Sequence, residues 1–424
     1  MNIGDCKATE ERDAKVREYI SRLVSIQNKL ARHNKYFYVY ITPSKASYTQ
    51  VNIPDKYWLQ SEGGGKRISE VFRNELSNSN VNVFDSISCI PSDREWPLFY
   101  KTGIHWSRPI EQLSNIELVN RLAQLSGKNF HNNHICGLNI SDTPFWRDAD
   151  VYDLLNVCHK IPDTKFYEFA VEDDNMQENT IPYDELRILV QGGSYSEGII
   201  MDHFSHYALD DRYLLFYNQL ERQTDNSAKA IKDNDWNNID LQFYLDNVDF
   251  VVIEVNEAAI PLFSNGFAEY LDSFLDNYRP IPRKIPRDYV FDPMRKIGLM
   301  DSRNFYGFEG DFSWCGKNSY VGLENANISQ NGLNVRYVVP EEIFKFEPDI
   351  EVVLRINGCF MGKKKYNKFT QENIYISAEA LPKNVGDVYK IELCCSKTFN
   401  PKIMGMCEDA RDLALQVQYV GEAE

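Results

Sequence analysis

A run of β-branched and aromatic residues, VDFVVIEV at residues 248–255, most constrains the fold of this chain. Its apolar residues do not alternate with polar ones, which is typical of a strand buried on both faces of a parallel sheet. Shorter strands are predicted at residues 36–41, 81–87, 187–191 and 213–217, and amphipathic helical segments lie between them, the first at 8–33. Alternating strands and helices predict an α/β domain with a mostly parallel sheet flanked by helices, and ligands at the carboxyl ends of its strands.

The pattern changes at YRPIPRKIPRD, residues 278–288, where closely spaced prolines indicate a linker or an extended segment. Beyond it, short β-rich runs are separated by Asn, Gly and Pro, which is typical of a β-sandwich. The sequence therefore predicts an α/β domain at residues 1–278, a linker at 279–294 and a sandwich at 295–424.

The charge of the chain disfavours binding to nucleic acid or to an anionic membrane surface, since the formal net charge is −16 and the pI is near 5.0. The one dense basic cluster, MGKKKYNK at residues 361–368, is interpreted as a solvated loop or strand edge. No apolar run reaches the ~18 residues of a membrane-spanning helix, and the polar N-terminus shows no signal peptide.

Neither a disulfide framework nor a metal centre is expected. The chain has nine cysteines, an odd number, and no CxxC pair. HNNHIC, at residues 131–136, has metal-like spacing but no further ligands nearby, which favours a structural loop over a zinc site. No cofactor is predicted.

Ser194 lies in RILVQGGSYSEGII, which is interpreted as a strand, a turn at Gly192-Gly193-Ser194 and a helix. A serine nucleophile needs exposure at a strand end and nearby N–H groups that stabilise an oxyanion. Glycines allow the tight turn, and the start of a helix supplies such donors. The alternative is that Ser194 only caps the helix, and this stretch alone does not exclude it.

A serine hydroxyl needs a base, and histidine is the usual one near neutral pH. Among seven histidines, His105 has the most promising surroundings, because it lies in FYKTGIHWS beside Trp106 and just before a predicted helix. Taken by itself it could also be a hydrogen-bonded core histidine.

Four stretches occur in an order that resembles the SGNH-hydrolase-like polysaccharide O-acetyltransferases, the group that contains the alginate acetyltransferases. They are FYVYITPSKASYTQVNIPDKY, LFYKTGIHWS, ILVQGGSYSEG and VDFVVIEVNEAAI, and they extend over roughly residues 35–270. The second is similar to the family's Tyr-x-x-x-Asp-x-His-Trp-Ser/Thr block, and the third to its Gly-x-Ser-Tyr/Phe-Ser block.

The resemblance implies that Ser194 is the nucleophile and His105 the base, but the position of the family's aspartate falls on Gly103. Three readings follow. Another acid substitutes, with Asp142, Asp148 and Asp150 as candidates; a backbone carbonyl orients His105; or the protein binds glycans without catalysis. Loss of the orienting carboxylate costs about four orders of magnitude in turnover in Ser-His-Asp hydrolases, so this position decides whether catalysis is expected.

Further residues are assigned to the site or to glycan binding on the same resemblance. The candidates for oxyanion or substrate contacts are Gly193, Tyr195, Trp106, Tyr217 and Asn218, and the candidates for stacking on sugar rings in the β domain are Trp314 and Tyr366. Lys45, Glu254 and Glu257 are considered as residues that shape the site, and Asn256 is expected to cap a helix. Asp409 and Arg411 are expected to form a structural ion pair.

The resemblance further implies an O-acetyltransferase that moves an acetyl group through an acetyl-serine onto hydroxyls of a bacterial surface or secreted polysaccharide. It also implies an extracellular, periplasmic or cell-surface location and an acetyl donor supplied by a membrane-bound O-acyltransferase. The alternatives are a catalytically impaired glycan-binding protein of a polysaccharide modification or export system, and an acetyl esterase.

Overall fold

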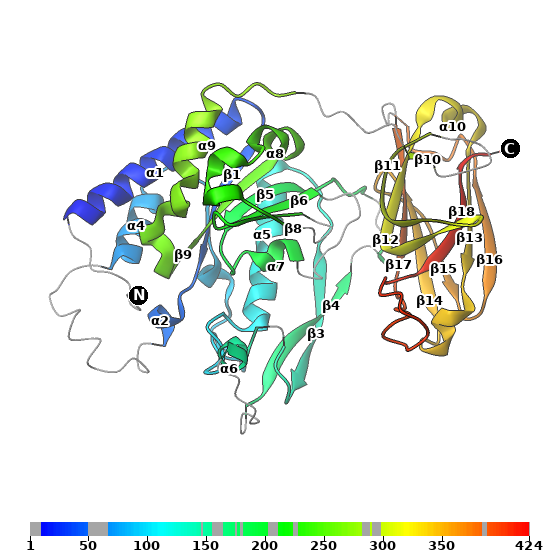
Figure 1. Cartoon of the computed structure of the whole chain (residues 1–424), viewed down its shortest axis with the longest axis horizontal. Coiled ribbons are helices and arrows are strands. Elements are labelled where there is room, and N and C mark those ends of the chain that lie inside the picture. Colours follow the sequence, from blue (N-terminus) through cyan, green and yellow to red (C-terminus); the bar gives the residue numbers. More distant parts are fainter. Residues whose placement is uncertain are drawn as a thin grey trace.

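The computed structural model describes residues 10–49, 67–145, 147–154, 164–173, 176–178, 181–201, 211–223, 228–281, 289–290, 298–383 and 388–423. Two separate sheets dominate these residues, one in each half of the chain (Figure 1). The chain passes from one to the other between Ile281 and Tyr289, within the predicted linker, and residues 282–288 lie outside the described residues.

The first sheet has seven strands, which in spatial order are β2 (Val83–Asp85), β1 (Tyr36–Thr42), β9 (Phe250–Asn256), β5 (Arg187–Gly192), β6 (Asp211–Phe216), β7 (Leu220–Gln223) and β8 (Ala228–Ala230). The first five are parallel, and β7 and β8 add an antiparallel edge. The five strands predicted from the sequence are therefore confirmed, and their carboxyl ends meet at one edge of the sheet.

Helices cover both faces of this sheet, as the alternating pattern predicts. The α-helices within the described residues are α1 (Glu10–Ala31), α2 (Lys45–Tyr48), α4 (Ile68–Ser77), α5 (Arg108–Ser126), α6 (Asp150–Leu154), α7 (Glu197–Met201), α8 (Leu241–Asn247), α9 (Phe267–Leu275) and α10 (Asn325–Asn331). Short 3₁₀ helices are η3 (Ser86–Cys89), η5 (Lys232–Asn234), η6 (Trp236–Asn238), η7 (Glu257–Gly266) and η8 (Glu341–Lys345).

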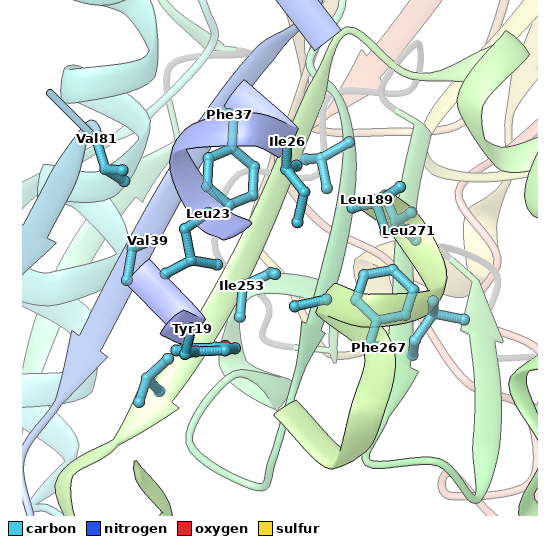
Figure 2. Packing of buried hydrophobic residues seen from close by; sticks show 14 of the residues in the cluster. Tyr19, Leu23, Ile26, Phe37, Val39, Val81, Leu189, Ile253, Phe267 and Leu271 are labelled. Carbon is cyan, nitrogen blue, oxygen red and sulfur yellow. The ribbon is translucent and has the colours of Figure 1, made fainter. Parts of the chain in front are cut away.

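Alternate residues of the central strands enter two different cores. On β1, Phe37 and Val39 pack with α1, α4, α8 and α9, and Figure 2 shows them beside Leu23, Ile26 and Ile253. Tyr38 and Tyr40 point to the opposite face and pack with α5. A strand buried on both faces needs apolar residues at every position, which explains why the strongest strands lack alternation.

A two-stranded antiparallel ribbon, β3 (Asn133–Ser141) with β4 (Phe166–Asp173), extends beside α5. The prediction of a structural loop at HNNHIC was wrong in part, because β3 begins at Asn133. The sequence gives only a weak strand signal here because most of β3 is exposed on both faces. Burial therefore imposes no alternation of apolar and polar residues on it.

The second half of the chain forms an antiparallel sheet with the strand order β15 (Cys359–Tyr366), β14 (Ile350–Ile356), β17 (Val388–Cys395), β12 (Phe312–Glu324), β18 (Leu415–Glu422), β13 (Leu333–Val339) and β16 (Thr370–Ile376). Two more strands, β11 (Gly298–Glu309) and β10 (Tyr289–Val290), attach to it through β12. Residues 318–324 of β12 pair with β17, whereas residues 313–315 pair with β18. The sequence predicts a β-sandwich of two sheets. The structure instead has one continuous sheet that folds back on itself around a shared core.

A buried arginine joins the two halves. The side chain of Arg355 on β14 is fully buried, donates to the carbonyl oxygen of Gln177 (2.6 Å) and lies 5.0 Å from the centre of the Tyr183 ring. Nearby, Lys390 of β17 forms an ion pair with Glu185. The β domain therefore contacts the segment that leads into β5.

Candidate active site

Ser194 and His105 meet at the carboxyl edge of the parallel sheet. Ser194 follows β5 directly, and His105 lies in the loop before α5. Nε2 of His105 is 2.7 Å from Oγ of Ser194. Ser194 is partly exposed, so its hydroxyl lies within reach of a ligand.

The acid on the other side of His105 is Asp150, the first residue of α6. Its Oδ2 accepts a hydrogen bond from Nδ1 of His105, and its Oδ1 accepts one from the backbone N–H of Ile104 (2.8 Å). A carboxylate at Nδ1 holds the ring proton there, which leaves the lone pair of Nε2 facing the serine hydroxyl. Ser194, His105 and Asp150 therefore form a complete Ser-His-Asp chain.

The turn that carries Asp150 packs directly against Gly103 and leaves no room for a side chain at position 103. A Cβ atom at position 103 would lie 2.9 Å from the carbonyl oxygens of both Arg147 and Asp148, and 3.0 Å from Oδ1 of Asp150. The loop around Gly103 is joined to this turn, because Thr102 donates to the Asp148 carbonyl (2.6 Å) and accepts from the Val151 N–H (3.0 Å). An aspartate at position 103 would collide with the segment that supplies Asp150.

The other two acidic candidates lie away from the imidazole. Asp142 forms an exposed ion pair with Lys165 (2.6 Å). Asp148 is buried and accepts from the backbone N–H of Arg108 (3.2 Å), and burial raises the pKa of its carboxyl group to about 8. A carboxyl group that stays protonated at neutral pH cannot act as the anionic partner of a histidine.

The electrostatic surroundings favour a neutral His105. Burial lowers the pKa of its imidazole, and the positive charge of Arg147 lowers it further, whereas Asp150 acts in the opposite direction. Burial and a nearby cation both disfavour the imidazolium form. A neutral imidazole is the form that can accept the serine proton.

The prediction that the Gly193 N–H stabilises an oxyanion was wrong, since this group already donates to Oε2 of Glu254 (2.8 Å). Glu254 is buried, and its other oxygen accepts from the Thr42 hydroxyl. Burial raises the pKa of Glu254, while both hydrogen bonds lower it. Within the described residues the Ser194 N–H donates to no protein acceptor. It is therefore the remaining backbone candidate for a hydrogen-bond donor to the oxyanion.

A side chain at position 193 would have to displace the Tyr217 side chain, which lies against this glycine. A Cβ atom there would be 2.7 Å from the Tyr217 hydroxyl oxygen. Tyr217 itself has a left-handed backbone (φ 51°), which is uncommon for an aromatic residue and marks the sharp end of β6. Asn218, its neighbour, donates to the Asn234 carbonyl (3.0 Å) and thus stabilises a turn instead of reaching the serine.

Of the two aromatic candidates next to His105 and Ser194 in the chain, Tyr195 packs on the imidazole and Trp106 packs on Tyr195. The Tyr195 ring centre is 5.1 Å from that of His105 and 5.3 Å from that of Trp106, and its hydroxyl donates to the Ile104 carbonyl (2.9 Å). Trp106 is only 3% exposed, so its assignment to substrate contacts was wrong and it is a core residue. Tyr195 packs on the imidazole and fixes the loop that carries it.

Three residues suggested by the motifs stabilise loops at this edge. Nζ of Lys45 donates to the carbonyl oxygens of Tyr100 (2.7 Å) and Gly103 (2.6 Å). Glu257 accepts from the Ser44 N–H (2.8 Å) and pairs with Arg73. Asn256 accepts from the Ala258 N–H (3.0 Å), which confirms that it caps η7.

The two stacking candidates in the β domain were wrong. Trp314 is 9% exposed and packs against Phe312 and Phe399, and Tyr366 is 6% exposed with its hydroxyl bonded to that of Tyr337. Aromatic residues of a small β domain mostly fill its core, and periodicity alone does not separate core rings from binding rings. The ion pair of Asp409 with Arg411 (2.6 Å) is confirmed.

The basic stretch at residues 361–368 is also accounted for by its neighbours. Lys363, Lys364 and Lys365 on β15 each form an ion pair with an acidic residue, at 3.6, 2.7 and 2.9 Å. These pairs neutralise much of the cluster.

Arg147 is the residue that the sequence interpretation missed. Its Nη1 donates to the Ser194 carbonyl (2.8 Å) and lies 3.5 Å from Nε2 of His105. The signal that could have found it is its spacing in RDAD, residues 147–150, since it precedes the candidate acid Asp150 by less than one helical turn.

The fold and the site define an α/β protein with a Ser-His-Asp arrangement at the edge of a parallel sheet. No protein-family model matches the chain, and no curated protein does so either. No helix in the described part of the chain has the length and apolar character needed to traverse a membrane.

Similar solved structures include the O-acetyltransferase domain of Pseudomonas putida AlgJ, with 14% identity over 65% of this chain and 94% of that one (TM-score 0.38). Pseudomonas aeruginosa AlgX is 13% identical over 100% of this chain and 91% of its own (TM-score 0.36). Bacillus cereus PatB1 is 11% identical over 61% of this chain and 97% of its own (TM-score 0.33).

Proposed function

We propose that the protein is an SGNH-hydrolase-like serine O-acetyltransferase that moves an acetyl group onto hydroxyls of a bacterial surface or secreted polysaccharide. The observation that carries this proposal is the hydrogen-bonded chain from Ser194 through His105 to Asp150. It supplies a nucleophile, a base and an orienting carboxylate in the arrangement that serine acyl transfer requires.

In the first step, Nε2 of His105 takes the hydroxyl proton of Ser194 while Oγ attacks the acetyl carbonyl carbon of the donor. The Ser194 N–H is the candidate donor to the oxyanion that forms. The carbonyl re-forms, the bond to the leaving group breaks, and Nε2 gives its proton to that group. The product is an acetyl ester on Ser194.

In the second step, a sugar hydroxyl replaces the leaving group. Nε2 takes its proton as the hydroxyl oxygen attacks the acetyl-serine, and the Ser194 oxygen recovers that proton when the ester bond breaks. Asp150 stabilises the imidazolium in both steps without becoming protonated itself. Water in place of the sugar would make the protein an acetyl esterase.

The remaining assignments belong to the same proposal. The α/β unit at residues 1–278 would carry the chemistry, and the β domain at 295–424 would contact the glycan through residues other than Trp314 and Tyr366. The acetyl donor would come from a membrane-bound O-acyltransferase at the periplasmic or extracellular face. The alternative of a catalytically impaired glycan-binding protein was considered because Gly103 replaces the family's aspartate. With Asp150 as the orienting carboxylate, that reason no longer applies.

The test uses p-nitrophenyl acetate as donor and acidic or neutral oligosaccharides as acceptors, with acetylated sugar detected by mass spectrometry. We expect wild-type protein to acetylate an acceptor and the Ser194→Ala variant to lose this activity. Ser77→Ala is the matched control, because its hydroxyl donates to the Arg73 and Asn74 carbonyls within α4. Release of acetate without any acetylated sugar would favour the esterase, and an inert wild-type protein would contradict both.

A further inference from the structure

Arg147 brings a positive charge to the side of the Ser-His pair that faces away from Asp150. Its Nη1 is 2.8 Å from the Ser194 carbonyl oxygen and 3.5 Å from Nε2 of His105. The same atom therefore reaches both the backbone of the nucleophile and the nitrogen that must accept its proton.

A buried carboxylate fixes the position of this guanidinium. Glu197 is 3% exposed and pairs with Arg147, and its other oxygen is 3.3 Å from Arg222. Glu197 belongs to the first turn of α7, which begins three residues after Ser194. Arg147 thus links the turn that carries Asp150 to the turn that carries Ser194.

We propose that Arg147 is a charge-tuning and positioning residue of this site, which fixes the Ser194 turn and keeps the His105 imidazole uncharged and ready to accept the serine proton. The proposed function supplies the reaction in which this matters, and in that sense the inference rests on it. The charge effect itself is a property of the resting protein and can be measured without catalysis.

The charges around His105 come from three directions. Asp150 on α6 and the more distant Glu111 on α5 raise the pKa of the imidazole, and Arg147 and burial lower it, with burial the largest cause. The Tyr195 ring packs on the imidazole from the turn after β5. Arg147 is therefore a cation that opposes Asp150, and its removal should raise the pKa of the imidazole towards the charged form, although burial still acts against that form.

A neutral base matters because a protonated His105 could not activate Ser194. At the same time Asp150 is needed for tautomer and orientation, and its charge alone would raise the pKa of the base it orients. A fixed cation 3.5 Å from Nε2 resolves this conflict, since it offsets the carboxylate without touching Nδ1.

The test is an NMR titration of His105 in protein labelled on its histidine rings, with His105→Gln used to assign the signal. We expect Arg147→Gln to raise the pKa of His105 by about one unit, and Arg147→Lys, which keeps the charge, to raise it less. Arg121→Gln is the matched control: it removes a surface cation of α5 that pairs with Glu117, and it should leave the titration unchanged.

A purely structural role for Arg147 would lower the melting temperature without moving this titration, and an unchanged His105 pKa in Arg147→Gln would overturn the proposal. The pH profile of kcat/KM provides the second readout, in which the acid limb should move to higher pH by the same amount. A titration shift in a protein that transfers no acetyl group would refute the proposed function and leave the charge-tuning role standing.

Discussion

Replacing Asp150 with asparagine should remove nearly all acetyl transfer while the fold persists. Asp150 accepts two hydrogen bonds, one from Nδ1 of His105 and one from the Ile104 N–H (2.8 Å). The asparagine side chain has one oxygen. When that oxygen keeps the Ile104 N–H, the amide NH₂ faces Nδ1, and the ring proton must move to Nε2.

A proton on Nε2 removes the lone pair that accepts the Ser194 hydroxyl. In Ser-His-Asp hydrolases this change costs about 10⁴-fold in kcat, which corresponds to about 5.4 kcal/mol of transition-state stabilisation. We expect a loss of that order in Asp150→Asn, measured as p-nitrophenol release from p-nitrophenyl acetate under single-turnover conditions, with circular dichroism to verify folding.

Asp142→Asn is the matched control, because Asp142 is an acidic residue of the same region whose exposed partner is Lys165. It should retain wild-type activity. Turnover by Asp150→Asn within about 10-fold of wild type would refute the assignment of Asp150 as the orienting acid, since the tautomer argument predicts a far larger loss.

Two further predictions concern the contact between the loop at Gly103 and the turn that carries Asp148 and Asp150. Gly103→Ala should lower the free energy of unfolding by about 1–3 kcal/mol and kcat/KM by about 10²-fold, because its Cβ would press on the carbonyls of Arg147 and Asp148. Thermal unfolding and steady-state kinetics measure these two effects. The control is Gly137→Ala, whose Cβ would meet its nearest neighbour at 3.7 Å and which should change neither quantity. Wild-type behaviour of Gly103→Ala would contradict the packing argument. Burial raises the pKa of Asp148 to about 8, above its unfolded value, so the folded state binds more protons and stability falls as pH rises from about 4 to 8. In urea unfolding, Asp148→Asn should therefore lose less stability over that range than wild type, by up to about 1.36 kcal/mol per pH unit. Equal slopes of stability against pH for both proteins would contradict this prediction.

The strands of the parallel sheet could be predicted because burial on both faces leaves a clear mark in the sequence. Residues 250–253 form a continuous apolar run because Phe250 and Val252 enter one core while Val251 and Ile253 enter the other. The meeting of Ser194 with His105 follows from the same logic, since parallel strands end at one edge of the sheet.

The acid could not be identified from the sequence because its position depends on a contact between two loops. Asp142, Asp148 and Asp150 are equivalent in a sequence, and only the fold decides which carboxylate reaches Nδ1 of His105. Gly103 was the indirect signal: its missing side chain leaves room for the turn that carries Asp150.

Burial also explains the errors in the list of binding residues. Trp106, Trp314 and Tyr366 are aromatic residues that close a core, and a ring suited to stacking on a sugar has the same composition as a ring that packs inside. The engagement of the Gly193 N–H by Glu254 joins residues 61 positions apart in the chain and leaves no local mark.

In the proposed mechanism the Ser194 oxygen forms a covalent acetyl ester, which peptide mass spectrometry detects in protein quenched in acid after brief exposure to p-nitrophenyl acetate. We predict one acetyl group on the peptide that contains Ser194, lost when an oligosaccharide acceptor is added before the quench and absent from Ser194→Ala. An unmodified Ser194 in protein that still releases p-nitrophenol, or acetyl groups found on lysines alone, would contradict the account.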